Sequence, residues 1–346
     1  NGNHAVYLWS TYVRAIRGIW VLGSFSENAH ASLIKNPHGL DTGDQDKLIF
    51  ANIGRKEVNN DVRLGISSLL TTEYSYDAAA NGKSDISRER YKTIERIVNQ
   101  AIDAYPRPTH LLLPELSLPK RWINTVSSFL LEAGISLIAG LDYFKPTDET
   151  IYSEAVLILI DDRLGFPSSV QIRQPKSYPA PGEEERLKKF FGLDWAKDVE
   201  KIKKIIYNHF GFHFSVLVCS ELQNIRHRQA AQGQIDCLMV LSWNQDIESF
   251  SSLVESASLD VHAYIALVNN RAFGDSRVRS PAKKSYSRDI CRLRGGENEH
   301  VVVASIDIEK LRSFQSRDKR WPNEKDPYNP VPEGYSISTL RKRIPK

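Results

Sequence analysis

Residues 211–224 read GFHFSVLVCSELQN, and this stretch introduces both the fold class and the first candidate site. An apolar run from Ser215 to Val218 indicates a buried strand that ends at Cys219. A cysteine here is compatible with a core thiol that packs like a small hydrophobe. It is equally compatible with a nucleophile mounted on the rigid end of a strand. The rest of the chain has to separate these two interpretations.

Similar apolar segments recur along the chain and alternate with amphipathic ones. We expect strands at 63–70, 110–115, 135–144, 151–160, 169–174, 235–242, 265–270 and 301–306. We expect helices at 87–105, 120–134, 183–204 and 225–233, and a further helix from residue 247. The strands are apolar on both faces, which is typical of sheets covered on both sides. The alternation predicts an α/β protein, and the number of hairpin-like strands favours mixed sheets.

Composition divides the chain into three expected parts. Residues 1–62 combine an apolar, aromatic segment at helix-like spacing with a polar connection, which we interpret as the end of a preceding module and a linker. Because the sequence begins with Asn1 rather than Met, we expect a fragment, a domain of a larger protein or a processed chain. Residues 63–312 form the predicted α/β domain, and residues 313–346 form a basic C-terminal extension.

The overall composition excludes several classes of protein. With 346 residues, of which 41% are hydrophobic and 25% charged, the chain is an ordinary globular protein. Its apolar runs are too short to span a bilayer, so no membrane association is expected. The net charge of +4 is concentrated in the C-terminal tail, and we expect contact with nucleic acid only through a partner.

Cysteine and histidine usage argues against disulfides and metals. The chain has three cysteines and neither a CxxC nor an HExxH pattern, so we expect a cytoplasmic protein without a metal site. His209 and His213 flank a strand-like segment, where an i,i+4 pair does not converge, and we interpret both as structural. No GxGxxG or Walker A loop indicates a nucleotide cofactor.

Three strands end at residues of complementary chemistry, namely Glu115, Lys176 and Cys219. A cysteine attacks as the thiolate and needs a base and a nearby positive charge. A glutamate can take the thiol proton and return it to a leaving amine. A lysine can stabilise the oxyanion of a tetrahedral intermediate. Together the three are chemically sufficient for acyl transfer from a nitrogen centre.

The segments LLLPELSLP, QIRQPKSYPAPGEE and GFHFSVLVCSELQN resemble, in this order, the three motifs of the carbon–nitrogen hydrolase (nitrilase/amidase) superfamily. Gly140 matches a family glycine between the first two motifs, and IDCLMVLSWN, IALVNNRAFGDS and VVVASIDIEKL resemble later family strands. The resemblance covers about residues 63–312. It implies a four-layer α-β-β-α sandwich with two mixed sheets.

The resemblance also implies residue roles. Glu115 would be the general base and acid, Lys176 would stabilise the tetrahedral intermediate, and Cys219 would become an acyl-thioester. The backbone N–H of Ser220 would complete the oxyanion hole. The family also has a second glutamate after its lysine; Glu184 and Glu183 both fit, and the choice stays open.

Two further residues are candidates for substrate binding, Trp243 and Asn270, although packing and turn roles explain them equally well. The implied activity is hydrolysis of a non-peptide C–N bond in a small-molecule amide, nitrile or carbamoyl substrate, without metal or organic cofactor. The resemblance implies a homo-oligomer that assembles through helices beside the site. Ser177 and Ser220 depart from the residue types usual at their positions, which leaves the substrate unidentified.

The alternative is a catalytically inactive or regulatory nitrilase-like scaffold within a larger protein. The helical start and the basic tail suit a chain with a fused upstream domain. Nitrilase-like regions attached to prokaryotic antiviral reverse transcriptases are one such context, although this chain has no polymerase motif.

Overall fold

The computed structural model describes residues 19–22, 49–54, 60–163, 168–197, 204–318 and 323–343. In this part of the chain an 8-stranded sheet has the order β1-β7-β6-β5-β4-β3-β15, with β8 added beside β6. Its strands are β1 (Ile19–Leu22), β3 (Asp61–Ser68), β4 (His110–Leu118), β5 (Ser136–Phe144), β6 (Thr150–Asp161), β7 (Ser168–Pro175), β8 (Asp194–Trp195) and β15 (His300–Asp307).

A 7-stranded second sheet has the order β14-β13-β12-β11-β10-β9-β2. Its strands are β2 (Ile49–Ile53), β9 (Ile205–His209), β10 (Phe212–Val218), β11 (Cys237–Ser242), β12 (Tyr264–Asn269), β13 (Ser276–Arg279) and β14 (Asp289–Leu293). Strand β10 runs parallel to β11 and antiparallel to β9, and β4 runs parallel to β5, which runs antiparallel to β6. Both sheets are therefore mixed, as the sequence predicts.

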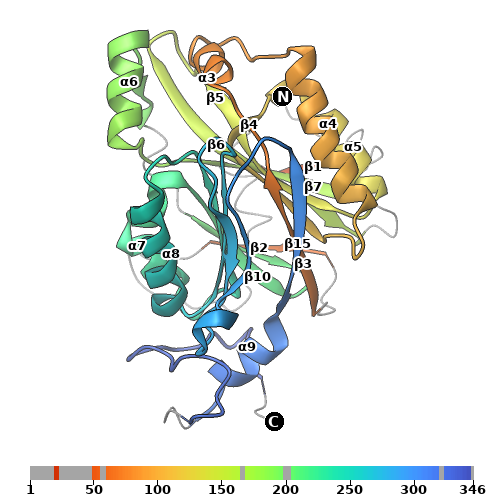
Figure 1. Cartoon of the computed structure of the whole chain (residues 1–346), viewed down its shortest axis with the longest axis vertical. Helices are drawn as coiled ribbons and strands as arrows, with labels where there is room; N and C mark the ends of the chain where they lie inside the picture. The colour runs from red at the N-terminus through yellow and green to blue at the C-terminus, as the bar shows by residue number, and fades with distance from the viewer. Residues whose placement is uncertain are drawn as a thin grey trace, which may run out of the picture.

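Side-chain alternation along β4 explains why the two sheets stack. Leu112 packs in a buried cluster with Val216 of the second sheet, whereas Leu111 and Leu113 pack in a separate cluster under helices. Helices α4 (Arg88–Asp103) and α5 (Ile123–Glu132) cover the outer face of the first sheet, and α7 (Ile225–Ala231) and α8 (Ile247–Asp260) cover that of the second (Figure 1). The predicted four-layer α-β-β-α sandwich is confirmed.

Two further helices gather at one end of the sandwich. Helix α3 (Glu73–Ala80) and helix α6 (Pro181–Phe191) lie at the top of the view in Figure 1, and α9 (Ile308–Gln315) lies at the opposite end. Thr72 caps α3, because its hydroxyl accepts a hydrogen bond from the backbone N–H of Ser75 at 3.1 Å. Helix α3 thus occupies the long connection between the first strand and its helix.

The sheets extend beyond the boundaries expected at residues 63 and 312. Strand β2 pairs with β9 over its whole length, and β1 pairs with β7, so segments from the expected preceding module complete both sheets. In the basic extension, Arg341 is fully buried and donates to Asp236 at 2.9 Å. Edge-strand pairing and a buried ion pair, which composition does not reveal, make these segments part of the sandwich. Residues 1–18 lie outside the described part.

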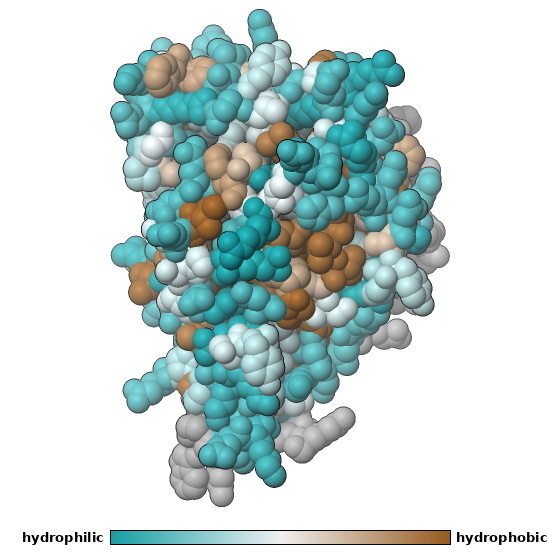
Figure 2. All heavy atoms as spheres, viewed as in Figure 1, coloured by the Kyte–Doolittle hydropathy of each residue, from teal (hydrophilic) through white to brown (hydrophobic). Residues whose placement is uncertain are grey.

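The surface is mainly hydrophilic on the face shown in Figure 2, with apolar residues gathered near its middle. In the part of the chain that the structure describes, no helix is long and apolar enough to cross a membrane.

Candidate active site

The backbone is irregular beside two of the predicted site residues: Glu115 lies within β4, where the ladder is interrupted, and Cys219 follows β10. Within β4 the pairing with β5 is interrupted between Leu113 and Leu118, where Pro114 cannot donate to the ladder, and Leu116 has a φ of 54°. At the end of β10, Cys219 has a φ of 49° and begins a 3₁₀ turn, η3 (Cys219–Gln223). Positive φ values at non-glycine residues are sparsely populated and gather at functional sites.

Gly140 on β5 allows the neighbouring backbone of β4, which carries Glu115, to approach closely. A Cβ atom at Gly140 would lie 2.4 Å from the Cα of Glu115 and 2.6 Å from the carbonyl oxygen of Pro114. Any side chain would therefore displace the strand that carries Glu115. The glycine that the family resemblance singled out thus has a steric reason.

The side chains of Lys176, Glu115 and Glu183 form a buried ionic cluster. The Lys176 ammonium donates to Glu115 Oε1 at 2.9 Å and to Glu183 Oε2 at 2.5 Å. Glu183 Oε1 accepts from the hydroxyl of Tyr143 at 2.6 Å, and its Oε2 also accepts from the backbone N–H of Ala180 at 3.0 Å. Each oxygen of Glu183 is thus paired, which holds the Lys176 ammonium against Glu115.

Burial and charge shift the ionisation of the cluster. Burial raises the pKa of Glu115. The positive charge of Lys176 lowers this pKa, and the negative charge of Glu183 raises it, so that it lies above its usual value overall. Burial disfavours the charged ammonium, but Glu115 and Glu183 outweigh it and raise the pKa of Lys176 well above its usual value. The lysine is a permanent cation, and the glutamate is poised to exchange a proton.

The Cys219 thiol joins the cluster from the second sheet. Its sulfur accepts from the Ser242 hydroxyl at 3.6 Å, and the charges of Glu115 and Lys176 act on it from nearby. Burial, followed by the negative charge of Glu115, raises the pKa of Cys219 to about 12, against the effect of Lys176. The resting residue is therefore a protonated thiol with a carboxylate beside it.

Glu221 connects the lysine segment to the cysteine turn, a role that the sequence did not reveal. Its Oε1 accepts from the backbone N–H of Ser177 at 2.8 Å, and its Oε2 accepts from that of Val218 at 2.9 Å. Lys204 pairs with the same carboxylate at 2.5 Å. The Cys-x-acid spacing was the available signal, because a carboxylate two residues after the cysteine can reach back to the strand end.

The structure decides between the two glutamates that follow the lysine. Glu183 faces inward and binds Lys176, whereas Glu184 is exposed. The supporting position is thus occupied by Glu183 instead of Glu184, because consecutive residues at the start of α6 point about 100° apart.

The structure places the two candidate substrate-binding residues in different surroundings. Trp243 is partly buried beside the cluster and packs edge-on against Tyr76, with ring centroids 5.1 Å apart. Asn270 is fully buried, and its amide is used by the loop before α3: it donates to the Thr71 carbonyl at 2.8 Å and accepts from the Thr71 N–H at 3.3 Å. Asn270 is therefore corrected to a loop anchor, since its amide is committed to the backbone.

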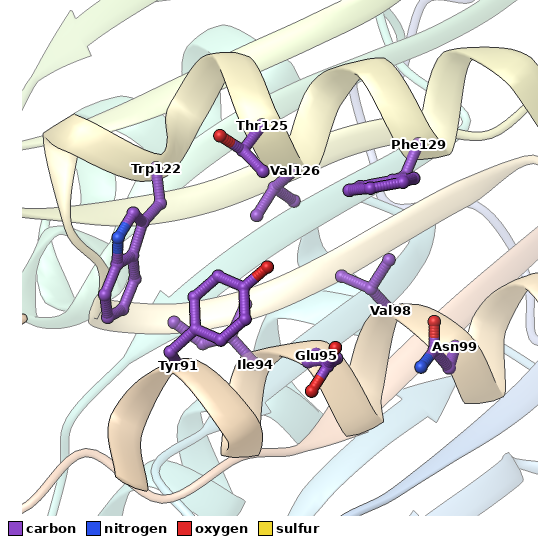
Figure 3. Close-up of a pocket in the computed structure, with 9 residues that line it drawn as sticks. All are labelled: Tyr91, Ile94, Glu95, Val98, Asn99, Trp122, Thr125, Val126 and Phe129. Carbon is purple, nitrogen blue, oxygen red and sulfur yellow. The ribbon is translucent and has the colours of Figure 1, made fainter. Parts of the chain in front are cut away.

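A separate groove lies between α4 and α5, lined in part by Tyr91, Trp122 and Phe129 (Figure 3). It contains none of the predicted site residues. Among the described residues no cluster of His, Cys, Asp or Glu is arranged to hold a metal ion. The candidate chemistry is thus confined to the cluster at the strand ends.

Comparison with known proteins finds likeness only at the level of structure. No family model and no curated protein matches the chain. A cysteine-to-serine variant of the amidase of Nesterenkonia AN1, described as from the nitrilase superfamily, matches with a TM-score of 0.51 and 15% identity over 74% of this chain and 95% of that chain.

Two further structures of that amidase match similarly. One shows covalent addition of the acetamide moiety of fluoroacetamide at its active-site cysteine, with a TM-score of 0.51 and 14% identity over 74% of this chain and 92% of that chain. Another, a cysteine-to-alanine variant in complex with butyramide, has a TM-score of 0.51 and 15% identity over 74% of this chain and 94% of that chain. The chain therefore shares the fold of a nitrilase-superfamily amidase.

Proposed function

We propose that the protein hydrolyses a non-peptide C–N bond, most simply that of a small carboxamide, through Glu115, Lys176 and Cys219. The observation that supports the proposal is that buried Glu115 pairs with the Lys176 ammonium, and that both charges act on the buried Cys219 thiol. A core thiol has no need of a buried glutamate and lysine, and burying these charges is costly.

Acylation begins with proton transfer from the Cys219 thiol to the Glu115 carboxylate. The sulfur attacks the substrate carbonyl carbon, the C–S bond forms, and the carbonyl electron pair moves to oxygen. The Lys176 ammonium and the backbone N–H of Ser220 stabilise this oxyanion. Glu115 then gives its proton to the nitrogen, the C–N bond breaks, and ammonia or an amine leaves a thioester on Cys219.

Deacylation repeats these roles with water. Glu115 takes a proton from water, whose oxygen attacks the thioester carbonyl, and Lys176 again stabilises the oxyanion. The C–S bond breaks, the proton returns to the Cys219 sulfur, and the carboxylic acid leaves. Glu183 keeps Lys176 in position throughout.

The experiment combines turnover with covalent labelling. The purified chain is incubated with butyramide, and ammonia release is measured for wild type, Cys219→Ala and the matched control Cys291→Ala. In parallel, fluoroacetamide is added and the labelled cysteine is located by mass spectrometry. Attack by sulfur on the CH₂ carbon expels fluoride while Glu115 accepts the thiol proton.

We expect ammonia release by wild type and Cys291→Ala but not by Cys219→Ala, and labelling at Cys219 that is faster than at Cys237 or Cys291. Equal labelling of the three cysteines, with no amide hydrolysed, would instead support the alternative, an inactive scaffold of a larger protein such as one in antiviral defence. The proposed cytoplasmic location and homo-oligomer do not enter this test.

A further inference from the structure

Helix α3 is held at its N-terminal end by two sets of hydrogen bonds. Asn270 holds the backbone of Thr71, one residue before the N-cap of the helix. The Ser75 hydroxyl, in the first turn, donates to Asp85 Oδ2 at 2.6 Å, and Asp85 Oδ1 accepts from the backbone N–H of Ser87 at 3.0 Å. These hydrogen bonds tie α3 to the second sheet and to the start of α4.

Arg186 of α6 clamps the same helix from the other side. Its guanidinium donates to Glu73 and to Asp77, each at 2.6 Å, and lies 4.0 Å from the centre of the Tyr76 ring. Two ion pairs and a cation–π contact therefore position one aromatic side chain. The α6 helix that supplies Arg186 also supplies Glu183 to the ionic cluster.

The fixed side chain, Tyr76, points into the region of the candidate site. Only 6% of the residue is exposed, and its ring packs edge-on against Tyr143 at 5.5 Å and Trp243 at 5.1 Å. Tyr143 donates to Glu183, and Trp243 follows Ser242, whose hydroxyl donates to the Cys219 sulfur. Through Tyr143 and Trp243, Tyr76 is thus one contact away from Glu183 on one side of the site and from the segment beside Cys219 on the other.

The Tyr76 hydroxyl is buried and has no hydrogen-bond partner among the described residues. The neighbouring Tyr143 hydroxyl donates its proton to Glu183 and does not pair with Tyr76 in ordinary hydrogen-bond geometry. Leaving a buried hydroxyl unpaired destabilises the protein, and a bound ligand that accepts its hydrogen bond would recover that cost. A phenylalanine would pack equally well in this position without that cost.

We propose that the Tyr76 hydroxyl donates a hydrogen bond to the substrate, and that the site takes short, uncharged carboxamides whose acyl chain carries an oxygen acceptor, such as a hydroxyl group. This inference rests on the proposed function, of which it names the substrate class. The contact would distinguish such amides from apolar amides of the same size.

The charges around Tyr76 agree with an uncharged substrate. Glu115 and Glu183 share one ammonium, that of Lys176, so a substrate carboxylate would meet excess negative charge. Burial raises the pKa of Tyr76 to about 12, and Glu183 contributes to the shift, so the phenol stays protonated and donates.

The test uses two isosteric probes, 3-hydroxypropionamide and butyramide, which differ by a hydroxyl in place of a methyl group. Wild type, Tyr76→Phe and Tyr74→Phe are compared by kcat/KM. Tyr74 lies on the same helix but is 72% exposed, which makes it a matched control. We expect Tyr76→Phe to lose about tenfold on 3-hydroxypropionamide and less than about twofold on butyramide, with Tyr74→Phe unchanged.

A binding measurement separates this inference from the hydrolytic proposal. The affinities of both probes are measured calorimetrically for Cys219→Ala with and without Tyr76→Phe. A preference of Cys219→Ala for 3-hydroxypropionamide that disappears with Tyr76→Phe supports the contact even if wild type hydrolyses neither probe, in which case the proposed function alone fails. Three results would overturn the inference and leave Tyr76 as a packing residue. They are equal affinities of Cys219→Ala for the two probes, no binding of either probe, and an equal loss of affinity for both probes when Tyr76→Phe is added.

Discussion

The carboxylate of Glu221 accepts a hydrogen bond from the backbone N–H of Ser177 at 2.8 Å, across the gap between the two sheets. Ser177 follows Lys176, and Glu221 lies in the turn of Cys219. This one contact therefore fixes the distance between an ammonium on the first sheet and a thiol on the second.

Replacing Glu221 tests that link. Glu221→Ala removes the acceptors for Ser177 and Val218, so Lys176 and Cys219 lose their common support. We expect kcat/KM for butyramide to fall about 10- to 100-fold, because small misplacements of reacting groups are this costly. Steady-state kinetics with Glu184→Ala as the control measures it. Wild-type kinetics in a folded Glu221→Ala protein would contradict the link.

The pH dependence of the reaction should depend on Glu183. Its negative charge contributes, after burial, to the raised pKa of Glu115. Glu183→Gln removes this charge, lowers the pKa of Glu115, and keeps the base ionised at lower pH. We therefore expect the acid limb of the kcat/KM profile to move to lower pH, whatever the change in overall rate. The exposed Glu184→Gln variant should leave the limb in place; a shift to higher pH would refute the assignment.

Gly140 should tolerate no side chain. Gly140→Ala places a methyl group 2.4 Å from the Cα of Glu115, so β4 must move. Overpacking of this kind costs about 1–3 kcal/mol, and we expect a matching loss in the free energy of unfolding together with loss of activity. Urea titration measures it. Gly182→Ala is the control, since nothing lies within 4 Å of its Cβ position; equal stability of the two variants would be the contrary result.

A buried histidine pair should make stability depend on pH. His209 donates from Nε2 to the Ile160 carbonyl at 2.8 Å and accepts at Nδ1 from His110 at 2.9 Å, between the sheets. Burial lowers the pKa of His209 to about 4 and that of His110 well below its usual value. The unfolded chain therefore binds protons first as the pH falls below about 6.5.

The contribution of His209 to the free energy of unfolding should be fully present above pH 6.5. It should be lost between about pH 6.5 and about pH 4, and the loss should amount to roughly 3 kcal/mol for His209 alone. His213 adds a loss of the same sign, because burial lowers its pKa to about 4 as well. Urea titrations at stepped pH measure the slope. His209→Gln should flatten it relative to the control His300→Gln; an unchanged slope would show that the pair does not titrate as described.

The sequence predicts features that depend on short stretches of chain. The strands around Leu112 and Val216 follow from local apolar runs, and Glu115, Lys176 and Cys219 follow from where such runs end. Gly140 was singled out only by the resemblance to the family. The choice between Glu183 and Glu184 is not visible in the sequence, because both lie in one charged run and only the rotation of α6 about its axis separates them.

Features that join distant segments escape the sequence. Strand β2 pairs with β9 from more than 150 residues away, and Arg341 reaches Asp236 across a sequence separation of 105 residues. Asn270 looks like a candidate substrate residue until its amide is found on the backbone of Thr71. In each case two groups pair that are far apart in the sequence, and their residue types alone do not reveal which partner each one has.

The sequence by itself therefore determined the α/β class and the mixed sheets, since periodicity is a local property of the chain, and it singled out three candidate residues where apolar runs end. Only the tertiary structure decided which glutamate faces the lysine, how Glu221 connects the two sheets, and that Arg186 holds Tyr76 beside the site. The reason is physical: hydrogen bonds and ion pairs depend on distances of a few ångströms, and those distances exist only after the two sheets have packed together.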